Sequence, residues 1–234
     1  MVKKFKSLLE YKKSTRDWHY DPSVKSKDCK FIGRITNLNF KKFKSKIIDK
    51  KPESSVKLYD DDFKNGKIIP TQLSPNSIGA CKLDHIKHGY NDNNSLYCQW
   101  IDNRDEMPKE FQKIKKLSGL DFVTIACMKQ EPGNTNPWHF DNYLSALKRA
   151  NLEYKDIKKI SRYLLFLEDW DWGHILQIGN NVLSNWKAGD LYTWDSGIYH
   201  LSANCGISTK WTCQITGVTT KKSIHNLKRN LFKF

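Results

Sequence analysis

The chain is 234 residues long, carries a formal net charge of +15, and is 38% hydrophobic with eight tryptophans. This length suits one domain, or one domain with appendages, and this aromatic content excludes a disordered chain. No segment approaches the roughly 18 consecutive apolar residues that a membrane-spanning helix needs, and the Lys-rich N-terminus lacks the apolar stretch of a signal peptide. We therefore expect a soluble, cytoplasmic protein with no membrane association.

The positive charge is concentrated at the two ends of the chain. Residues 1–51 hold 16 Lys/Arg against 5 Asp/Glu, residues 221–234 hold five basic groups and no acidic one, and residues 121–217 have a net charge of −1. Such flanks can hold an anionic partner, such as nucleic acid or an acidic protein, or can form a solvated surface without a specific partner. The second interpretation is favoured, because no aromatic-interleaved basic motif of a known nucleic-acid module is present.

Two amphipathic helices are predicted in the first half of the chain. In residues 37–51, apolar side chains recur at helical spacing after an asparagine that can cap the helix. In residues 107–118, a proline near the first turn precedes an apolar face, and Gly119 follows as a stop signal. Residues 52–95 are rich in Asp, Asn, Ser and Pro and indicate loops with short strands. Residues 1–120 are thus expected to form a basic extension whose helices and strands support the next segment.

From residue 121 the pattern changes to short β-branched or aromatic runs that Gly, Asn and Asp punctuate. The runs are DFVTIACMKQ, YLLFLED, HILQIG, DLYTW and KWTCQITGV. One helical stretch is predicted at about 143–160. Many short strands with turn signals favour a sandwich or barrel over a parallel α/β sheet. We therefore predict a mainly β (α+β) fold with a core at 121–220 and a basic tail at 221–234.

The segment PWHFDNY holds a candidate metal-binding pair. If it ends a strand, side-chain alternation places His139 and Asp141 on the same side. A distal histidine could complete the set, and the chain offers His174, His200 and His225. His200 has the most informative context, because a turn and an aromatic strand precede it. Two histidines and one carboxylate on one face of an octahedron leave three open positions, which suits iron(II) with a chelating cosubstrate and O2.

A second group of candidates follows the distal histidine. Ten residues after His200, Lys210 and Thr212 face the same side of a predicted strand. A buried lysine beside a hydroxyl group can hold a carboxylate by a charge-assisted hydrogen bond. The alternative for Lys210 is a solvated lysine at a strand end.

In combination, these residues resemble the pattern of the iron(II)- and 2-oxoglutarate-dependent dioxygenases of the double-stranded β-helix (jelly-roll, cupin-like) superfamily. That pattern is H-x-D, a distal His roughly fifty or more residues later, and about ten residues further an Arg or Lys that Ser or Thr often follows at the second position. The chain matches it with HFD at 139–141, His200 and KWT at 210–212. The run that begins at Arg162 resembles the strand with a leading Arg after the H-x-D loop. The resemblance covers about 121–218.

The resemblance implies that His139, Asp141 and His200 are the catalytic residues that bind Fe(2+). It further implies an enzyme that oxidises a substrate C–H bond with O2 and 2-oxoglutarate and releases succinate and CO2. Related halogenases lack the carboxylate ligand, so the presence of Asp141 favours a hydroxylase. The substrate cannot be read from the sequence, and an amino-acid or protein side chain is slightly favoured.

For the cosubstrate, the resemblance implies that Lys210 pairs with the far carboxylate of 2-oxoglutarate and that Thr212 donates its hydroxyl. Lys in place of the commoner Arg implies a monodentate contact. Arg162 is a further candidate for binding the cosubstrate, with a surface ion pair as its alternative. Two other functions remain open: a non-catalytic cupin-like metal- or ligand-binding protein, and a nucleic-acid modifier that uses the basic flanks.

Overall fold

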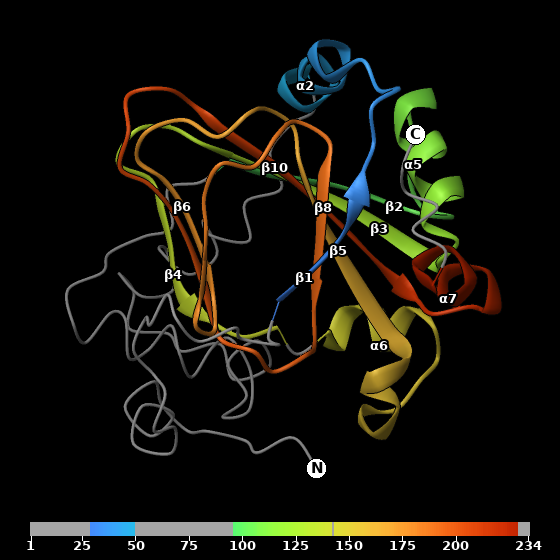
Figure 1. Cartoon of the computed structure of the whole chain (residues 1–234). Helices are drawn as coiled ribbons and strands as arrows, with labels where there is room; N and C mark the ends of the chain where they lie inside the picture. The colour runs from blue at the N-terminus through green and yellow to red at the C-terminus, as the bar shows by residue number, and fades with distance from the viewer. Residues whose placement is uncertain (1–28, 50–95, 142, 229–234) are drawn as a thin grey trace, which may run out of the picture.

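Two antiparallel sheets face each other in the computed structural model of the chain, which describes residues 29–49, 96–141 and 143–228 (Figure 1). The large sheet has the strand order β1-β8-β5-β10-β3-β2, and the small sheet has the order β4-β9-β6-β7. The strands are β1 (Cys29–Arg34), β2 (Leu96–Ile101), β3 (Asp121–Gln130), β4 (Thr135–His139), β5 (Ile160–Phe166), β6 (His174–Ile178), β7 (Asn181–Leu183), β8 (Asp190–Trp194), β9 (His200–Asn204) and β10 (Lys210–Val218). The predicted mainly β class, a double-stranded β-helix barrel, is confirmed.

Side-chain alternation along β10 gives the large sheet two different faces. Trp211, Cys213 and Ile215 belong to the apolar core that also contains side chains of the covering helices. Lys210 and Thr212 alternate with them and therefore face the small sheet across the barrel interior. The alternation of side chains that predicts β10 therefore also places its polar residues Lys210 and Thr212 on the face that lines the barrel interior.

Both helices predicted in the first half of the chain are confirmed as α2 (Phe40–Asp49) and α5 (Lys109–Ser118). The helix α2 follows Asn39, whose Oδ1 accepts the backbone N–H of Lys42 at 2.9 Å. The helix α5 ends at Gly119, which takes the left-handed conformation with φ 65°. The rings of Phe43 and Phe111 meet edge to face, with centroids 4.0 Å apart, and join both helices to the core of the large sheet.

The prediction of one continuous helical stretch at about 143–160 is wrong. The structure has a short helix α6 (Leu144–Arg149) and a separate 3₁₀ helix, η1 (Tyr154–Lys159). Asn151 between them has a φ of 52°, and the N–H of Leu152 bonds back to the carbonyl of Leu147 at 2.9 Å. A left-handed residue cannot continue a right-handed helix, so the chain turns at this point.

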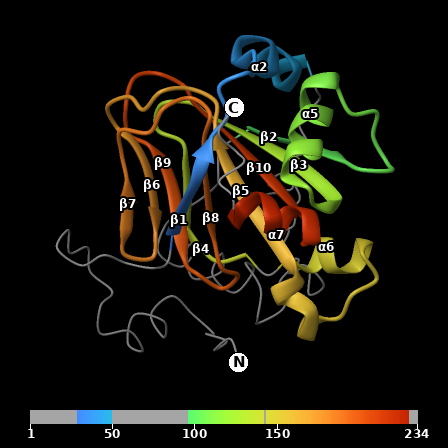
Figure 2. The same ribbon diagram turned by 45° about the vertical axis from the view of Figure 1, so that its right-hand side comes forward.

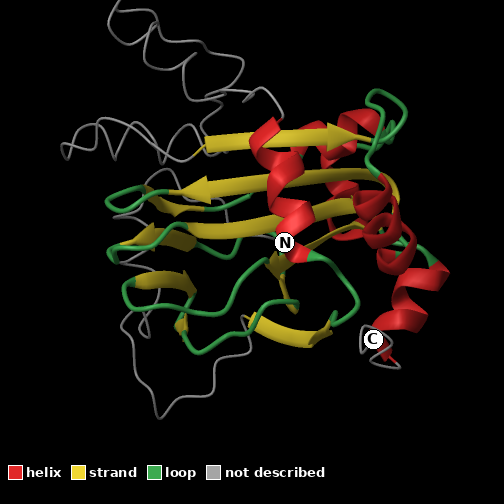
Figure 3. Ribbon diagram, turned by 90° about the horizontal axis from the view of Figure 1, so that it is seen from above, coloured by secondary structure: helices red, strands yellow, loops and turns green. Residues whose placement is uncertain are grey.

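Segments on both sides of residues 121–220 complete the fold. The strands β1 and β2 form the two edges of the large sheet, and residues from the basic C-terminal segment form α7 (Lys221–Lys228). The side-chain amide of Asn226 donates to the carbonyl of Leu117 at 2.8 Å, which joins α7 to α5. Figure 2 shows these helices beside the large sheet, and in Figure 3 one helix lies over the middle of the strands while the others lie to their right.

Several expectations concern parts of the chain outside the described residues. These are the loops predicted at 52–95 and those parts of the two basic flanks that fall in residues 1–28, 50–51 and 229–234. Within the described ranges, no helix is long and apolar enough to cross a membrane.

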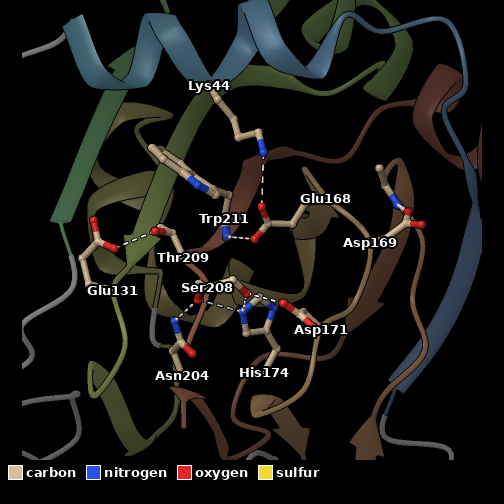
Figure 4. A network of polar contacts seen from close by, with 11 residues as sticks. Lys44, Glu131, Glu168, Asp169, Asp171, His174, Asn204, Ser208, Thr209 and Trp211 are labelled. Carbon is tan, nitrogen blue, oxygen red and sulfur yellow. Dashed lines mark hydrogen bonds and ion pairs between the residues drawn. The ribbon is translucent and has the colours of Figure 1, made fainter. Parts of the chain in front are cut away.

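A polar network lies at the end of the barrel where His174 pairs in register with Asn204 (Figure 4). The Ser208 hydroxyl donates to the carboxylate of Asp171, and the Ser208 carbonyl accepts hydrogen bonds from His174 Nε2 at 3.1 Å and Asn204 Nδ2 at 2.7 Å. These contacts join the loop before β6 to the loop before β10. Lys210, the first residue of β10, follows this loop and is 1% exposed.

Candidate metal centre

The residues His139, Asp141 and His200 converge at the other end of the barrel. His139 is the last residue of β4 and pairs in register with His200, the first residue of β9. Asp141 lies two positions beyond the end of β4. One ligand atom of each residue lies within 4.8 Å of the others, and all three side chains are buried. No other group of His, Cys, Asp or Glu in the described ranges meets this condition.

The protonation of His200 suits metal binding. Its Nδ1 lies 2.9 Å from the carbonyl oxygen of Ile198, and because a carbonyl can only accept, Nδ1 carries the proton and Nε2 carries the lone pair. This Nε2 is buried without a hydrogen-bond partner and lies 3.4 Å from Asp141 Oδ2. Adjacent ligands of an octahedral metal, each about 2.1 Å from it, are about 3 Å apart. The orphaned nitrogen and the carboxylate therefore fit a shared cation.

The charges of the three groups also fit a divalent metal. Burial by itself raises the pKa of Asp141, but the positive charge of Arg162, with smaller contributions from the two histidines, lowers that pKa to about 2. Burial lowers the pKa of His200 more than the neighbouring carboxylate raises it. At neutral pH the carboxylate is ionised and the imidazole of His200 is neutral, which are the forms that bind metals.

The structure places Arg162 beside the carboxylate of Asp141, one of the three candidate metal ligands. Its guanidinium group forms an ion pair with Asp141 in which both side chains are largely buried, with 14% and 8% of their surfaces exposed. The alternative of a surface ion pair is therefore wrong. Contact between Arg162 and a cosubstrate stays a prediction.

Lys210 is a buried lysine whose hydrogen-bond partners are all neutral groups. It is 1% exposed, and its ammonium group donates to the carbonyl of Ile175, to Ser202 Oγ at 2.7 Å and to the carbonyl of Ala203 at 3.4 Å. Burial lowers the pKa of Lys210 to about 7. The alternative of a solvated lysine at a strand end is therefore wrong. A buried ammonium group with no carboxylate among its hydrogen-bond partners is suited to binding an anion.

Lys210 and the candidate metal ligands lie in the interior of the same barrel. Ser202, which contacts Lys210, lies two residues after His200 and faces the same side of β9. Two residues of a strand span about 7 Å, a distance that a short dicarboxylate can bridge. Thr212 is buried on the same face of β10 as Lys210. Sequence reasoning missed Ser202, although its spacing from His200 was a signal for a shared face.

Comparisons with known proteins show similarity at the level of solved structures. No family model and no curated protein matches the chain. A prolyl-4-hydroxylase from Pseudomonas putida is similar with a TM-score of 0.48 and 12% identity, over 82% of this chain and 93% of that one. A predicted oxalate decarboxylase from Thermotoga maritima gives a TM-score of 0.32 and 16% identity over 53% and 81%. A cupin 2 conserved barrel domain protein from Salinispora arenicola gives 0.32 and 10% over 59% and 87%. At these levels of similarity, the function has to be argued from the geometry of the candidate site itself.

Proposed function

We propose that the protein is an iron(II)- and 2-oxoglutarate-dependent dioxygenase that hydroxylates a C–H bond, with an amino-acid or protein side chain as the favoured substrate class. One observation carries this proposal. A two-histidine, one-carboxylate group and a buried lysine without an anionic hydrogen-bond partner both meet β9, which carries His200 and also Ser202, the hydrogen-bond partner of Lys210. The two histidines and the carboxylate bind a metal and leave coordination positions open. The buried lysine can pair with the carboxylate of a bound cosubstrate.

Each residue then has a defined task. His139, Asp141 and His200 hold the metal on one face, and iron(II), when bound there, supplies the capacity to activate O2. Lys210 exchanges neutral acceptors for the far carboxylate of 2-oxoglutarate, and Thr212 adds a hydroxyl donor. The burial of Lys210 keeps water away from this pair, which strengthens the electrostatic contact.

The test is reconstitution of the full chain with Fe(II) and 2-oxoglutarate under anaerobic conditions, followed by addition of O2. We expect succinate to form slowly without a substrate and faster with the correct one, whereas Zn(II)-loaded protein should form none. Metal binding without any succinate, across amino-acid, peptide and nucleobase substrates, would instead identify a cupin-like binding protein.

Cosubstrate affinity is expected to depend on pH through Lys210. In the free protein its pKa is lowered to about 7, and a bound carboxylate favours the charged form, so binding above pH 7 takes up a proton. The dissociation constant should rise with pH above 7, by at most about tenfold per unit. Calorimetry in buffers of different ionisation enthalpy measures this uptake. A Lys210→Arg variant is the control, because arginine stays protonated and should remove the dependence.

A further inference from the structure

Arg162 is held from several sides in the barrel wall. Its backbone lies in β5, where its carbonyl accepts the hydroxyl of Thr193 at 2.7 Å. Its Nε donates to Thr216 Oγ1 at 2.9 Å, and its guanidinium group lies 4.8 Å from the ring centroid of Tyr143. Its Nη1 donates a hydrogen bond to Oδ2 of Asp141. The other contacts hold the guanidinium group in place, so it offers the Asp141 carboxylate a hydrogen-bond donor in a defined position.

The orientation of the Asp141 side chain depends on contacts with other side chains more than the orientations of the two histidines do. His139 and His200 belong to paired strands, so the β4–β9 ladder sets their backbones. Asp141 lies beyond the end of β4, and side-chain contacts have to orient its carboxylate. A carboxylate has about four lone-pair sites, so Oδ2 can accept the guanidinium N–H and still offer a lone pair to a metal.

We propose that Arg162 is a positioning residue that orients the Asp141 carboxylate for metal binding. This inference rests on the proposed function only in that the triad binds a divalent metal. The guanidinium charge also repels the cation, which opposes the effect. Orientation dominates, because loss of the outer partner of a metal ligand typically weakens metal affinity by about tenfold to a hundredfold.

The experiment measures Mn(II) and Co(II) binding to the full chain by calorimetry, without cosubstrate. Arg162→Met keeps much of the side chain's apolar length but removes its charge and donors, and we expect about tenfold to hundredfold weaker binding. Arg162→Lys should recover part of the affinity. Thr216→Val removes only the hydrogen bond to Nε, so its loss should be smaller. The visible absorption spectrum of bound Co(II) should change in Arg162→Met, since the carboxylate ligand is no longer held in place.

The ion pair between Arg34 and Asp190 supplies a matched control. The distance between Arg34 Nε and Asp190 Oδ1 is 2.5 Å. Asp190 is the first residue of β8, and Trp194, whose ring contacts His200, is the last, so this ion pair lies at the end of β8 away from the candidate metal centre. Arg34→Met should leave metal affinity and the Co(II) spectrum unchanged.

The possible outcomes separate this inference from the proposed function. Unchanged or tighter metal binding in a folded Arg162→Met protein would overturn the role of Arg162. If that variant does not fold, wild-type affinity in both Arg162→Lys and Thr216→Val would overturn it equally. Wild-type protein that binds no divalent metal would instead refute the metal centre, and with it the proposed function.

Discussion

Replacing Asp141 by asparagine is expected to abolish metal binding and 2-oxoglutarate turnover while the fold survives. Asp141 is the only anionic member of the triad, and the variant keeps its shape but removes the charge that neutralises part of the cation. The neighbouring guanidinium group of Arg162 would then repel the metal without the intervening carboxylate. Metal affinity should fall by more than about a hundredfold, beyond the range for an outer partner of a ligand.

The measurement for Asp141→Asn is calorimetric titration with Mn(II), together with succinate formation from Fe(II)-loaded protein. Thermal unfolding shows whether the variant is folded. Asp195→Asn is the matched control, because Asp195 is an exposed carboxylate near the same end of the barrel. Wild-type metal affinity in Asp141→Asn would mean that the cation binds elsewhere.

Lys210→Met is expected to lose 2-oxoglutarate binding and yet gain thermal stability. Hydrogen bonds to charged groups contribute about 1.5–3 kcal/mol, so affinity for the cosubstrate should fall about tenfold to a hundredfold. Metal affinity should stay unchanged, because Lys210 contacts Ser202 and backbone carbonyls rather than the triad.

The expected gain in stability follows from the burial of Lys210. Its pKa is lowered from 10.5 to about 7, so keeping it charged costs on the order of 5 kcal/mol at and below pH 7. Because the unfolded chain binds this proton more tightly, the cost shrinks as pH rises from 7 towards 10.5. Loss of the donors to Ser202 and the carbonyls offsets about 1–3 kcal/mol.

Unfolding of wild type and Lys210→Met should therefore be compared at pH 6 and pH 9. We expect the variant to be more stable by about 2–4 kcal/mol at pH 6 and to lose most of that advantage at pH 9. Lys187→Met is the control, because Lys187 is more than half exposed and pairs with a surface carboxylate. A less stable Lys210→Met protein at pH 6 would show that the ammonium group is a structural support rather than a strained binding group.

Lys210 and Asp141 illustrate how the requirements of a binding site can oppose the stability of the core. A buried ammonium group without a carboxylate destabilises the free protein, and under the proposed function the same charge would supply the affinity for a dicarboxylate. The buried carboxylate of Asp141 forms an ion pair with Arg162, and this pairing offsets part of the free-energy cost of burying its charge.

Local patterns explain why much of the fold was predictable from the sequence. The period of two in KWTCQITGV identifies β10 and separates Trp211 from Lys210 and Thr212 before any partner strand is known. The apolar spacing and the terminal Gly119 identify α5. The same local logic puts His139 and Asp141 on one side of a strand end. Where a single residue overrides the pattern, as Asn151 does with its left-handed backbone, the prediction of one helix was wrong.

The amino-acid sequence was enough to predict the strands, most of the helices and the three candidate ligands, because side-chain periodicity and chemical type are properties of neighbouring residues. The contacts between distant residues could be seen only in the folded protein. The register of β4 against β9 brings His139 to His200, and the pairing of β5 with β10 puts Arg162 opposite Thr216 and within reach of Asp141. The packing of the two sheets leaves Lys210 only 1% exposed. Pairing between distant strands depends on how whole sheet faces are buried against each other, and a single local stretch of sequence does not contain that information.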